Sequence, residues 1–341
     1  MITRTPSKIL NLARKPKLNP ASAGLVAALI LTGQAGTLFA AGPAAVNLRS
    51  TARFTVLAGA AVTTTGGGLI NGDVGASPIS GSAIHVTQAQ VNGTIYAVDA
   101  AGPAGSVIAP ALLSTAMGDL TSAINDAAGR PAATASPFLN PGAGNIGGLT
   151  LYPGLYTFGG TASITGSDVT LSGGPNDVWV FQVAKDLEEG NSIQIILAGG
   201  AQARNIFWQV GTSATIGTSA VFKGTILANQ AVTMDTSSSV DGRALAFNAG
   251  VTFDGTVGTL PVPVAPIFTS ISLTNKHSVT LVLSTSPYYL VTMQSTTNLT
   301  QVNWTTIATS TPTASPWVIT LTNAINTTPK NFYRAFITTP N

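Results

Sequence analysis

The stretch that decides the fold reads Ala231-Val-Thr-Met-Asp-Thr-Ser-Ser-Ser-Val-Asp-Gly242. Two further stretches align with it, Ser213-Ala-Thr-Ile-Gly-Thr-Ser-Ala-Val-Phe-Lys-Gly224 and Ala61-Val-Thr-Thr-Thr-Gly-Gly-Gly-Leu-Ile-Asn-Gly72. In each copy an Ala or Val is followed at once by Thr, and a Gly stands ten positions after that Ala or Val. The copies that end at Gly224 and Gly242 follow one another, and residues 250–255 begin another copy one position off the same period.

A period near 18–20 residues with short strands and small turn residues is typical of a β-solenoid, in which each coil covers the strand edges of the next. Side chains alternate along a strand, so the copies predict which residues face the core and which face solvent. The inward pairs are Ala214 with Ile216 and Val232 with Met234, and the outward residues between them are Thr215 and Thr233.

One segment departs from this β pattern. From Pro110 to about residue 128, apolar residues recur at three- and four-residue spacing, and Gly129-Arg-Pro131 ends the run. Proline is tolerated in the first turn of a helix. The spacing therefore predicts one amphipathic helix of about 19 residues, packed along the solenoid and burying one of its sides.

The two ends of the chain differ from this central domain. Residues 1–41 have a basic beginning, a short apolar run and small residues near 38–41, which predicts a signal peptide, with a retained membrane anchor as the alternative. The leader carries five of the 15 basic residues and no acidic one, so ten basic and twelve acidic residues follow it, a net charge of −2. The basic balance of the whole chain therefore says nothing of a nucleic-acid or lipid partner.

A Pro-rich linker at 261–266 separates the solenoid domain, 42–260, from residues 267–341. In this last part, short runs rich in Thr, Val, Ile and aromatic residues are separated by turn residues, as in a small antiparallel β-sandwich. The runs are 278–283, 289–293, 304–308 and 317–321. We therefore expect a mainly β protein: an irregular β-solenoid (β-helix) with one long α-helix packed alongside, plus a small C-terminal β-sandwich.

Composition excludes several kinds of site. Charged residues make up only 8% of the chain. Ordinary domains contain about 25%. The chain has 47 threonines, no cysteine and two histidines, His85 and His277, which rules out thiolate and multi-histidine metal centres. Asp186, Glu188 and Glu189 could hold a cation, although three acidic residues on a turn are more often simply solvated. We expect no catalytic residue, no metal and no cofactor.

The aromatic residues of the predicted strands leave two explanations open. Trp179, Phe181, Phe207 and Trp208 are explained most simply as core residues, and a sugar-binding platform is the alternative. The aspartates fall at predicted coil turns, where Asp is a frequent structural residue, rather than in pairs suited to glycoside hydrolysis.

Residues from about 46 to 260 resemble the DUF3494 family of secreted ice-binding (antifreeze) proteins. The segments that carry the resemblance occur in the order typical of the family. They are 54–58, 72–75, 126–130, 144–156, 168–173, 177–182, 199–210 and 242–246. Residues 184–191 depart from the family pattern, which usually has a small-residue turn at this place. After residue 266 the chain looks more loosely like a bacterial β-sandwich module appended to secreted proteins.

The resemblance implies a secreted, non-enzymatic protein that adsorbs to ice, with thermal hysteresis and inhibition of ice recrystallisation as the results. Ice would be the partner of a monomer that binds no nucleic acid and has no membrane span once the leader is removed. The resemblance and the repeat positions together predict an ice-binding face of ten residues. These are Thr63, Thr65, Thr165, Ser167, Thr215, Thr218, Thr233, Thr236, Ser238 and Thr252.

Three alternatives remain open at this point. The threonines could simply satisfy β-propensity on a solvated face. The chain could be an extracellular adhesin or carbohydrate-binding matrix module, with its C-terminal domain contacting a cell surface or carbohydrate. A carbohydrate-active enzyme comes third, because parallel β-solenoids also host lyases and hydrolases.

Overall fold

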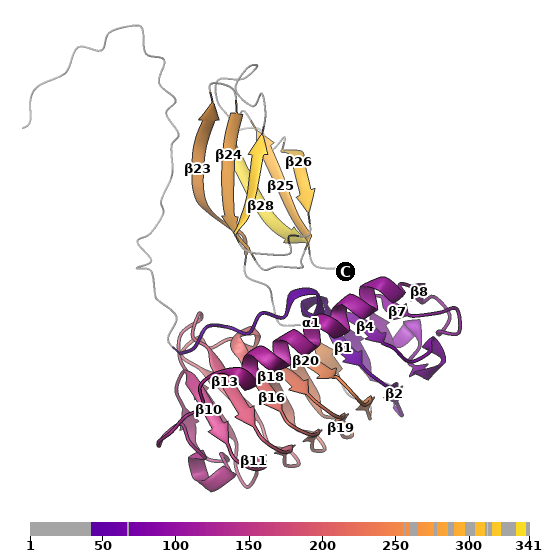
Figure 1. The fold of residues 1–341 in the computed structure, drawn as a ribbon, viewed down its shortest axis with the longest axis vertical. Coiled ribbons are helices and arrows are strands. Elements are labelled where there is room, and N and C mark those ends of the chain that lie inside the picture. Colours follow the sequence, from indigo (N-terminus) through magenta and orange to yellow (C-terminus); the bar gives the residue numbers. More distant parts are fainter. Residues whose placement is uncertain are drawn as a thin grey trace, which may run out of the picture.

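A computed structural model describes residues 42–66, 68–254, 257–259, 265–275, 278–285, 290–296, 304–310, 312, 316–321 and 332–338 (Figure 1). The predicted leader, 1–41, lies outside the described residues, and so do residues 261–264 of the predicted linker.

Parallel strands build an irregular β-solenoid with three faces, which confirms the fold expected from the repeat. The helix face consists, in spatial order, of β10 (Gly154–Phe158), β13 (Trp179–Val183), β16 (Ile206–Val210), β18 (Val221–Ala228), β20 (Ser239–Ala246), β1 (Phe54–Ala58), β4 (Asp73–Ala76), β7 (Ile95–Ala97) and β8 (Val107–Ile108). The threonine face consists of β11 (Ala162–Ile164), β14 (Leu187–Glu189), β17 (Ala214–Ile216), β19 (Val232–Met234), β21 (Val251–Phe253), β2 (Val62–Thr64) and β5 (Ile84–His85). The third face consists of β9 (Thr150–Leu151), β12 (Val169–Ser172), β15 (Ile195–Ala198), the first residues of β18 and β20, β22 (Val257–Thr259), β3 (Leu69–Asn71) and β6 (Val91–Asn92). Short 3-10 helices lie before or between these elements at Arg49–Arg53, Gly81–Ala83, Gln88–Gln90, Pro141–Gly144 and Ala203–Asn205.

The coils do not stack in the order of the chain. The first coil, β1 to β3, pairs with the last one: β1 with β20, β2 with β21 and β3 with β22. After the first coil the chain continues to one end of the helix face, at β8, and then returns to the other end, at β10. Helix α1 (Pro110–Gly129) makes that return along the helix face (Figure 1). A helix of this length spans about 30 Å. The six strand spacings of about 4.8 Å from β7 to β13, both of which the helix contacts, cover nearly the same distance.

The helix occupies the span that its apolar spacing predicts. Its buried residues are Leu113, Ala116, Met117, Leu120, Ala123, Ile124 and Ala127, and they pack against outward apolar side chains of the helix face such as Phe54 and Leu227. Gln182 on β13 holds the end of the helix, because its Nε2 donates to the carbonyls of Ala127 and Arg130, both at 2.9 Å. These bonds satisfy carbonyls that a helix C-terminus leaves without a backbone partner.

The interior of the solenoid is a continuous apolar core with an aromatic ladder. Tyr156, Phe181, Trp208 and Phe222 follow one another on successive coils, with ring centroids 5.2, 3.7 and 5.5 Å apart. Trp179 and Phe207 are buried as well. The four aromatic residues singled out in the sequence are therefore core residues, and the alternative of a sugar-binding platform at these positions is wrong.

The glycine at the end of each sequence copy marks a corner of the solenoid. Gly224 and Gly242 are register partners in the middle of β18 and β20, where each strand passes from the third face to the helix face. Gly224 has a φ of +113° and Gly72 has a φ of +124°, a region that side chains with a Cβ rarely adopt. A Cβ on Gly242 would lie 1.7 Å from the carbonyl oxygen of Gly224. The repeat therefore keeps glycine where the backbone must turn and neighbouring coils approach closely.

The C-terminal module is built from antiparallel strands, as the sequence predicts. One sheet has the order β23 (Ile267–Asn275), β24 (Ser278–Ser284), β27 (Trp317–Leu321), and the other has the order β26 (Thr305–Ser310), β25 (Leu290–Thr296), β28 (Phe332–Thr338). Val279, Leu281 and Leu283 from the first sheet share one core with Met293 from the second. The two sheets therefore pack face to face.

Candidate functional site

The three faces of the solenoid differ in what they offer to a ligand. Helix α1 covers the helix face. The third face carries an ion pair between Lys223 Nζ and Asp241 Oδ2 at 3.6 Å, together with the exposed apolar side chains of Leu69 and Ile196. No element of the described part of the chain covers the threonine face, and the central residue of its three-residue strands points outward.

Four threonines form a row across neighbouring strands of the threonine face. Thr215 pairs in register with Thr233, Thr233 with Thr252, and Thr252 with Thr63. Parallel strands lie about 4.8 Å apart, so the row extends over about 14 Å. Each threonine stands after a buried residue: Ala214, Val232, Val251 and Val62. The alternation predicted for the copies at 213–224 and 231–242 is thus confirmed, since Ile216 and Met234 are also buried.

Small residues lie beside this row. The residues that precede the four strands are Ser213, Ala231, Gly250 and Ala61, and backbone hydrogen bonds from β17, β19 and β21 to the carbonyls of the last three hold them in register. None of these four side chains is larger than that of serine, so the positions next to the row in each strand carry only short side chains. The result is a strip of backbone, methyl groups and hydroxyl groups.

On the other side of the row, an aspartate links two of the predicted threonines. Asp254 Oδ1 accepts a hydrogen bond from Thr65 Oγ1, and Asp254 Oδ2 accepts one from Thr236 Oγ1. The hydrogen bond from Thr236, followed by the one from Thr65, lowers the pKa of Asp254 below its usual value, against a small opposing effect of burial. The exposed hydroxyls of Thr65 and Thr236 are therefore held in fixed directions by a charged acceptor.

The row ends at an ionisable residue on each side. Glu188 on β14 is the register neighbour of Thr215, and His85 on β5 is the register neighbour of Thr63. Ser163 on β11 stands beyond Glu188 in the same register. The uncharged part of the row thus covers the four coils of β17, β19, β21 and β2.

The remaining predicted residues lie apart from the four central threonines. Thr218 is exposed on the turn after β17, where its N–H donates to Asn191 Oδ1 at 2.9 Å, and it neighbours Thr236 on the next coil. Thr165 and Ser167 are exposed on the turn after β11, and β14 with Glu188 separates them from Thr215.

The expectation that Ser238 lies on the exposed face is wrong. Ser238 is 1% exposed, and its Oγ donates to the carbonyl oxygen of Asp235 at 2.7 Å. The chain turns at Ser237, whose φ is +60°, and the next side chain points into the core. The same happens one coil earlier, where Ser219 has a φ of +59° and Ala220 is fully buried.

The acidic residues of the β14 coil do not form a cation site. Glu188 is exposed and Glu189 is buried, because they alternate along the strand. Asp186 accepts hydrogen bonds from Thr212 Oγ1 and from the N–H of Ser213. Within the described part of the chain, no three Asp, Glu or His side chains converge as metal ligands would.

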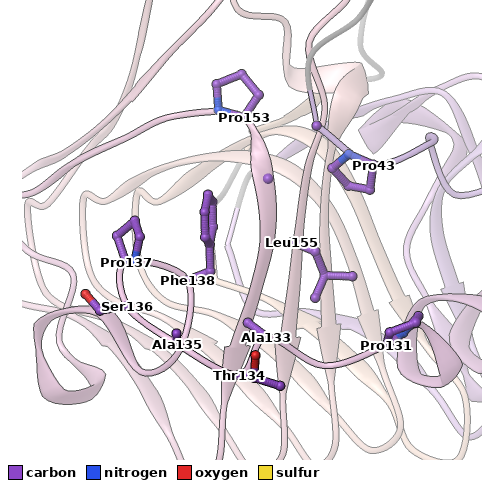
Figure 2. Close-up of a pocket in the computed structure, with 12 residues that line it drawn as sticks. Pro43, Pro131, Ala133, Thr134, Ala135, Ser136, Pro137, Phe138, Pro153 and Leu155 are labelled. Atoms are coloured by element: carbon purple, nitrogen blue, oxygen red, sulfur yellow. The ribbon is translucent and has the colours of Figure 1, made fainter.

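A hollow of about 530 Å³ lies at the β10 end of the solenoid, and Figure 2 shows it. Pro43, Pro131, Pro137, Phe138, Pro153 and the start of β10 line it, and none of its lining residues is ionisable. The hydroxyl groups of Thr134 and Ser136 therefore have no ionisable neighbour in the lining that could activate them as nucleophiles.

Two features of the threonine face lie outside the sequence prediction. The sequence did not indicate that the row ends at Glu188 and His85. It also did not indicate that Asp254 accepts hydrogen bonds from Thr65 and Thr236. Alternation along Leu187-Glu-Glu189 is a signal that could have placed Glu188 in the row. No comparable signal exists for the pairing of Thr65 with Asp254, which are 189 residues apart.

A parallel β-solenoid with one lengthwise helix and an exposed, threonine-bearing face is the architecture of a defined class of proteins. Residues 56–259 match the Ice-binding-like family, and the chain belongs to this family. An ice-binding protein of Flavobacterium frigoris is 46% identical over 216 residues, which cover 63% of this chain and 76% of that protein. An ice-binding protein of a Colwellia species is 41% identical, covering 63% and 84%.

Solved structures agree with this assignment. A glycosylated ice-binding protein from an Arctic yeast superposes with a TM-score of 0.59 at 33% identity, covering 67% of this chain and 99% of that one. The DUF3494 domain of an ice-binding protein from Shewanella frigidimarina gives a TM-score of 0.58 at 31% identity, covering 65% and 99%. Both matches account for about the length of the solenoid.

Proposed function

We propose that this chain adsorbs to ice through its threonine face. The observation that carries the proposal is the row of Thr215, Thr233, Thr252 and Thr63, which stand in register on four neighbouring parallel strands. The family of the chain and its ice-binding relatives support ice as the ligand.

The chemistry of ice explains why such a row suits it. Ice presents only water molecules at fixed distances, so a protein recognises it by holding its own bound waters at matching positions. The strand spacing of about 4.8 Å lies close to repeats of oxygen positions in ice planes. Threonine has a stiff χ1, a methyl group that discourages disordered water and a hydroxyl that anchors one water molecule. A lysine or glutamate in the row would move and keep a liquid-like hydration shell.

The role of Asp254 in this proposal is to orient neighbouring hydroxyl groups, and its charge does not itself recognise ice. Because it accepts from both Thr65 and Thr236, it fixes two further hydroxyls beside the row. Of the predicted residues, Thr63, Thr215, Thr233 and Thr252 form the centre of the proposed site, and Thr65, Thr218 and Thr236 form its margin. Thr165 and Ser167 form a separate patch beyond Glu188.

Adsorption accounts for function without turnover. Bound molecules force the ice front to curve outward between them, and a curved front melts at a lower temperature than a flat one. Thermal hysteresis and inhibition of recrystallisation follow. The proposal therefore includes no catalysis and no cofactor, and the non-ionisable lining of the hollow at β10 is in keeping with it.

Secretion is part of the proposal. The leader predicted at 1–41 would direct export, and a protein that meets ice outside the cell needs no permanent anchor. Among the described residues, no helix has the length and apolar character required to cross a bilayer.

Partitioning into a slowly growing ice hemisphere tests the proposal directly. The full chain is expected to enter the ice fraction, whereas Thr233→Tyr, which raises a bulky ring in the middle of the row, is expected to lose most of its partitioning. Thr170→Tyr is the matched control, because Thr170 stands between Thr150 and Ile196 in the parallel sheet of the third face. Exclusion of the unaltered chain from ice would refute ice binding, and equal loss in both variants would refute the face.

A further inference from the structure

The C-terminal module carries an exposed cluster on the outer surface of β26, β25 and β28. The Cζ of Arg334 lies 4.4 Å from the ring centroid of Trp304 and 5.9 Å from that of Phe336. Arg334 and Phe336 are exposed, and they face outward because Tyr333 and Ala335, which alternate with them along β28, pack against the module core. A guanidinium thus lies close to two aromatic side chains on the outer surface of the sheet.

Gln294 fixes the orientation of this guanidinium. Its Oε1 accepts hydrogen bonds from Arg334 Nε at 2.8 Å and from Arg334 Nη2 at 2.6 Å. Its Nε2 donates to Thr306 Oγ1 at 3.2 Å on the neighbouring strand. Nη1 of Arg334 donates to no residue in the described part of the module. The cation is therefore held in place by side chains that leave some of its donors unused.

No carboxylate side chain of the module can neutralise this cation. The sequence contains no Asp or Glu after Asp254, and Lys276, Lys330 and Arg334 give this last part of the chain a net charge of +3. Charge complementarity therefore favours an anionic ligand for this surface.

We propose that Trp304, Arg334 and Phe336 form a binding site for an acidic polysaccharide, a polymer of sugar rings that carry carboxylates. A carboxylate of the polymer would accept from Nη1 and Nη2 of Arg334, in the forked geometry that guanidinium and carboxylate share. The apolar C–H face of a sugar ring would lie against Trp304 or Phe336, whose rigid rings lose little conformational entropy on binding.

A polysaccharide fits this surface better than an acidic peptide does. The three residues lie on the outer surface of a sheet, where a peptide could pair its carboxylates with the cation but would gain little from the rings. An extended polymer of rings can use the cation and the aromatic faces at once. The site is separate from the threonine face, and its binding does not depend on ice.

The test measures binding of the full chain to alginate, a polymer of uronic acids, with neutral dextran and poly-glutamate as comparison ligands. Arg334→Gln is expected to weaken alginate binding at least about tenfold, which corresponds to about 1.4 kcal/mol. Lys330→Gln removes the same charge from the same module and is the matched control, with an expected change below about twofold. Phe336→Ala and Arg334→Lys are expected to weaken binding severalfold, because one loses the stacking ring and the other the planar fork.

Partitioning into ice and the circular dichroism spectrum should be unchanged in all these variants. This result would show that each variant is folded and that ice binding by the solenoid does not depend on the alginate site. Failure of the unaltered chain to bind alginate better than dextran would overturn the proposal. So would equal weakening by Lys330→Gln and Arg334→Gln, since the attraction would then be general. Binding of poly-glutamate as tightly as alginate would assign the surface to acidic peptides instead.

Discussion

Glu188 stands directly beside Thr215 in the register between β14 and β17, and both side chains are exposed. A carboxylate therefore takes the position that the next threonine of the row would occupy. Ser163 lies one strand further in the same register, so the geometry suited to the row continues past Glu188. The row therefore ends at β14 because of the side chain of Glu188, and the backbone arrangement of parallel strands continues beyond it.

Glu188→Thr should therefore enlarge the ice-binding surface. The substitution removes a mobile, hydrated charge and extends the row from four threonines to five, with Ser163 as a sixth hydroxyl. We expect thermal hysteresis at equal protein concentration to rise by roughly a quarter or more, in proportion to the row length at a strand spacing of about 4.8 Å. Asp241→Thr is the control, because it removes an acidic charge from the third face. An equal gain in both variants would mean that net charge is responsible.

Asp254→Ala should reduce ice binding without unfolding the protein. The substitution removes the acceptor that orients Thr65 and Thr236, and both hydroxyls then rotate freely. Asp235→Ala is the matched control on the neighbouring coil, since no described threonine hydroxyl donates to the Asp235 carboxylate. We expect recrystallisation inhibition to need severalfold more protein in Asp254→Ala and to change little in Asp235→Ala, with equal Tm values.

Asp254 also predicts a pH dependence of ice binding. Its pKa is lowered in the folded protein, so the carboxylate and its two hydrogen bonds persist throughout the neutral range. They are lost only as the pH falls through this lowered pKa. Thermal hysteresis should therefore be constant from pH 8 down to about pH 4 and fall below it. A decline that starts near neutral pH would contradict this role of Asp254.

Glu189 predicts the opposite pH dependence for stability. Its side chain occupies a core position that isoleucine occupies on both neighbouring strands, at Ile164 and Ile216. Neither of its carboxylate oxygens has a hydrogen-bond partner among the described residues. Burial, and secondarily the charge of Asp168, raises the pKa of Glu189 to about 8. The folded protein therefore holds a proton that the unfolded chain releases above pH 4.5. Stability should fall as the pH rises from there towards 8, by up to about 1.4 kcal/mol per pH unit.

Glu189→Gln should abolish this dependence. The variant keeps the shape of the side chain and removes the ionisation, so its free energy of unfolding should exceed that of the unaltered chain at pH 8 by on the order of 2–4 kcal/mol. At pH 4 the two should be nearly equal. Glu188→Gln changes the exposed neighbour and should leave the slope intact. Urea unfolding at a series of pH values measures both, and an unchanged slope in Glu189→Gln would show that another group is responsible.

Much of the fold could be predicted from local patterns in the sequence. The helix was predictable because Leu113, Leu120 and Ile124 follow a helical spacing, and the direction of each Thr-centred strand follows from alternation. The stacking order was not predictable. β1 pairs with β20 from the opposite end of the solenoid sequence, and no local pattern indicates which coil edges meet after the chain has returned along the helix.

The candidate site was predictable to the same extent and for the same reason. Thr215 and Thr233 belong to successive copies of the repeat, so their neighbourhood follows from its period. Thr63 joins the row only because β2 pairs with β21. Ser238 was misplaced because simple alternation was carried past β19 into a turn, where the left-handed Ser237 changes the direction of the following side chain.

The corner glycines give a final prediction, which tests the physical reason for the repeat. In Gly242→Ala the new Cβ would lie 1.7 Å from the carbonyl oxygen of Gly224 and 2.5 Å from its carbonyl carbon. Backbone on the adjacent coil cannot move aside without separating β18 from β20, so we expect a loss of at least about 3 kcal/mol in the free energy of unfolding. Gly118→Ala in helix α1 is the control, since a Cβ there meets nothing within 4 Å. Alanine also favours a helix by about 1 kcal/mol relative to glycine. Thermal unfolding should show a large fall in Tm for Gly242→Ala and a small rise for Gly118→Ala. A Tm for Gly242→Ala close to that of the unaltered chain would mean that the coils have room at this corner, and the glycine of the repeat would need another explanation.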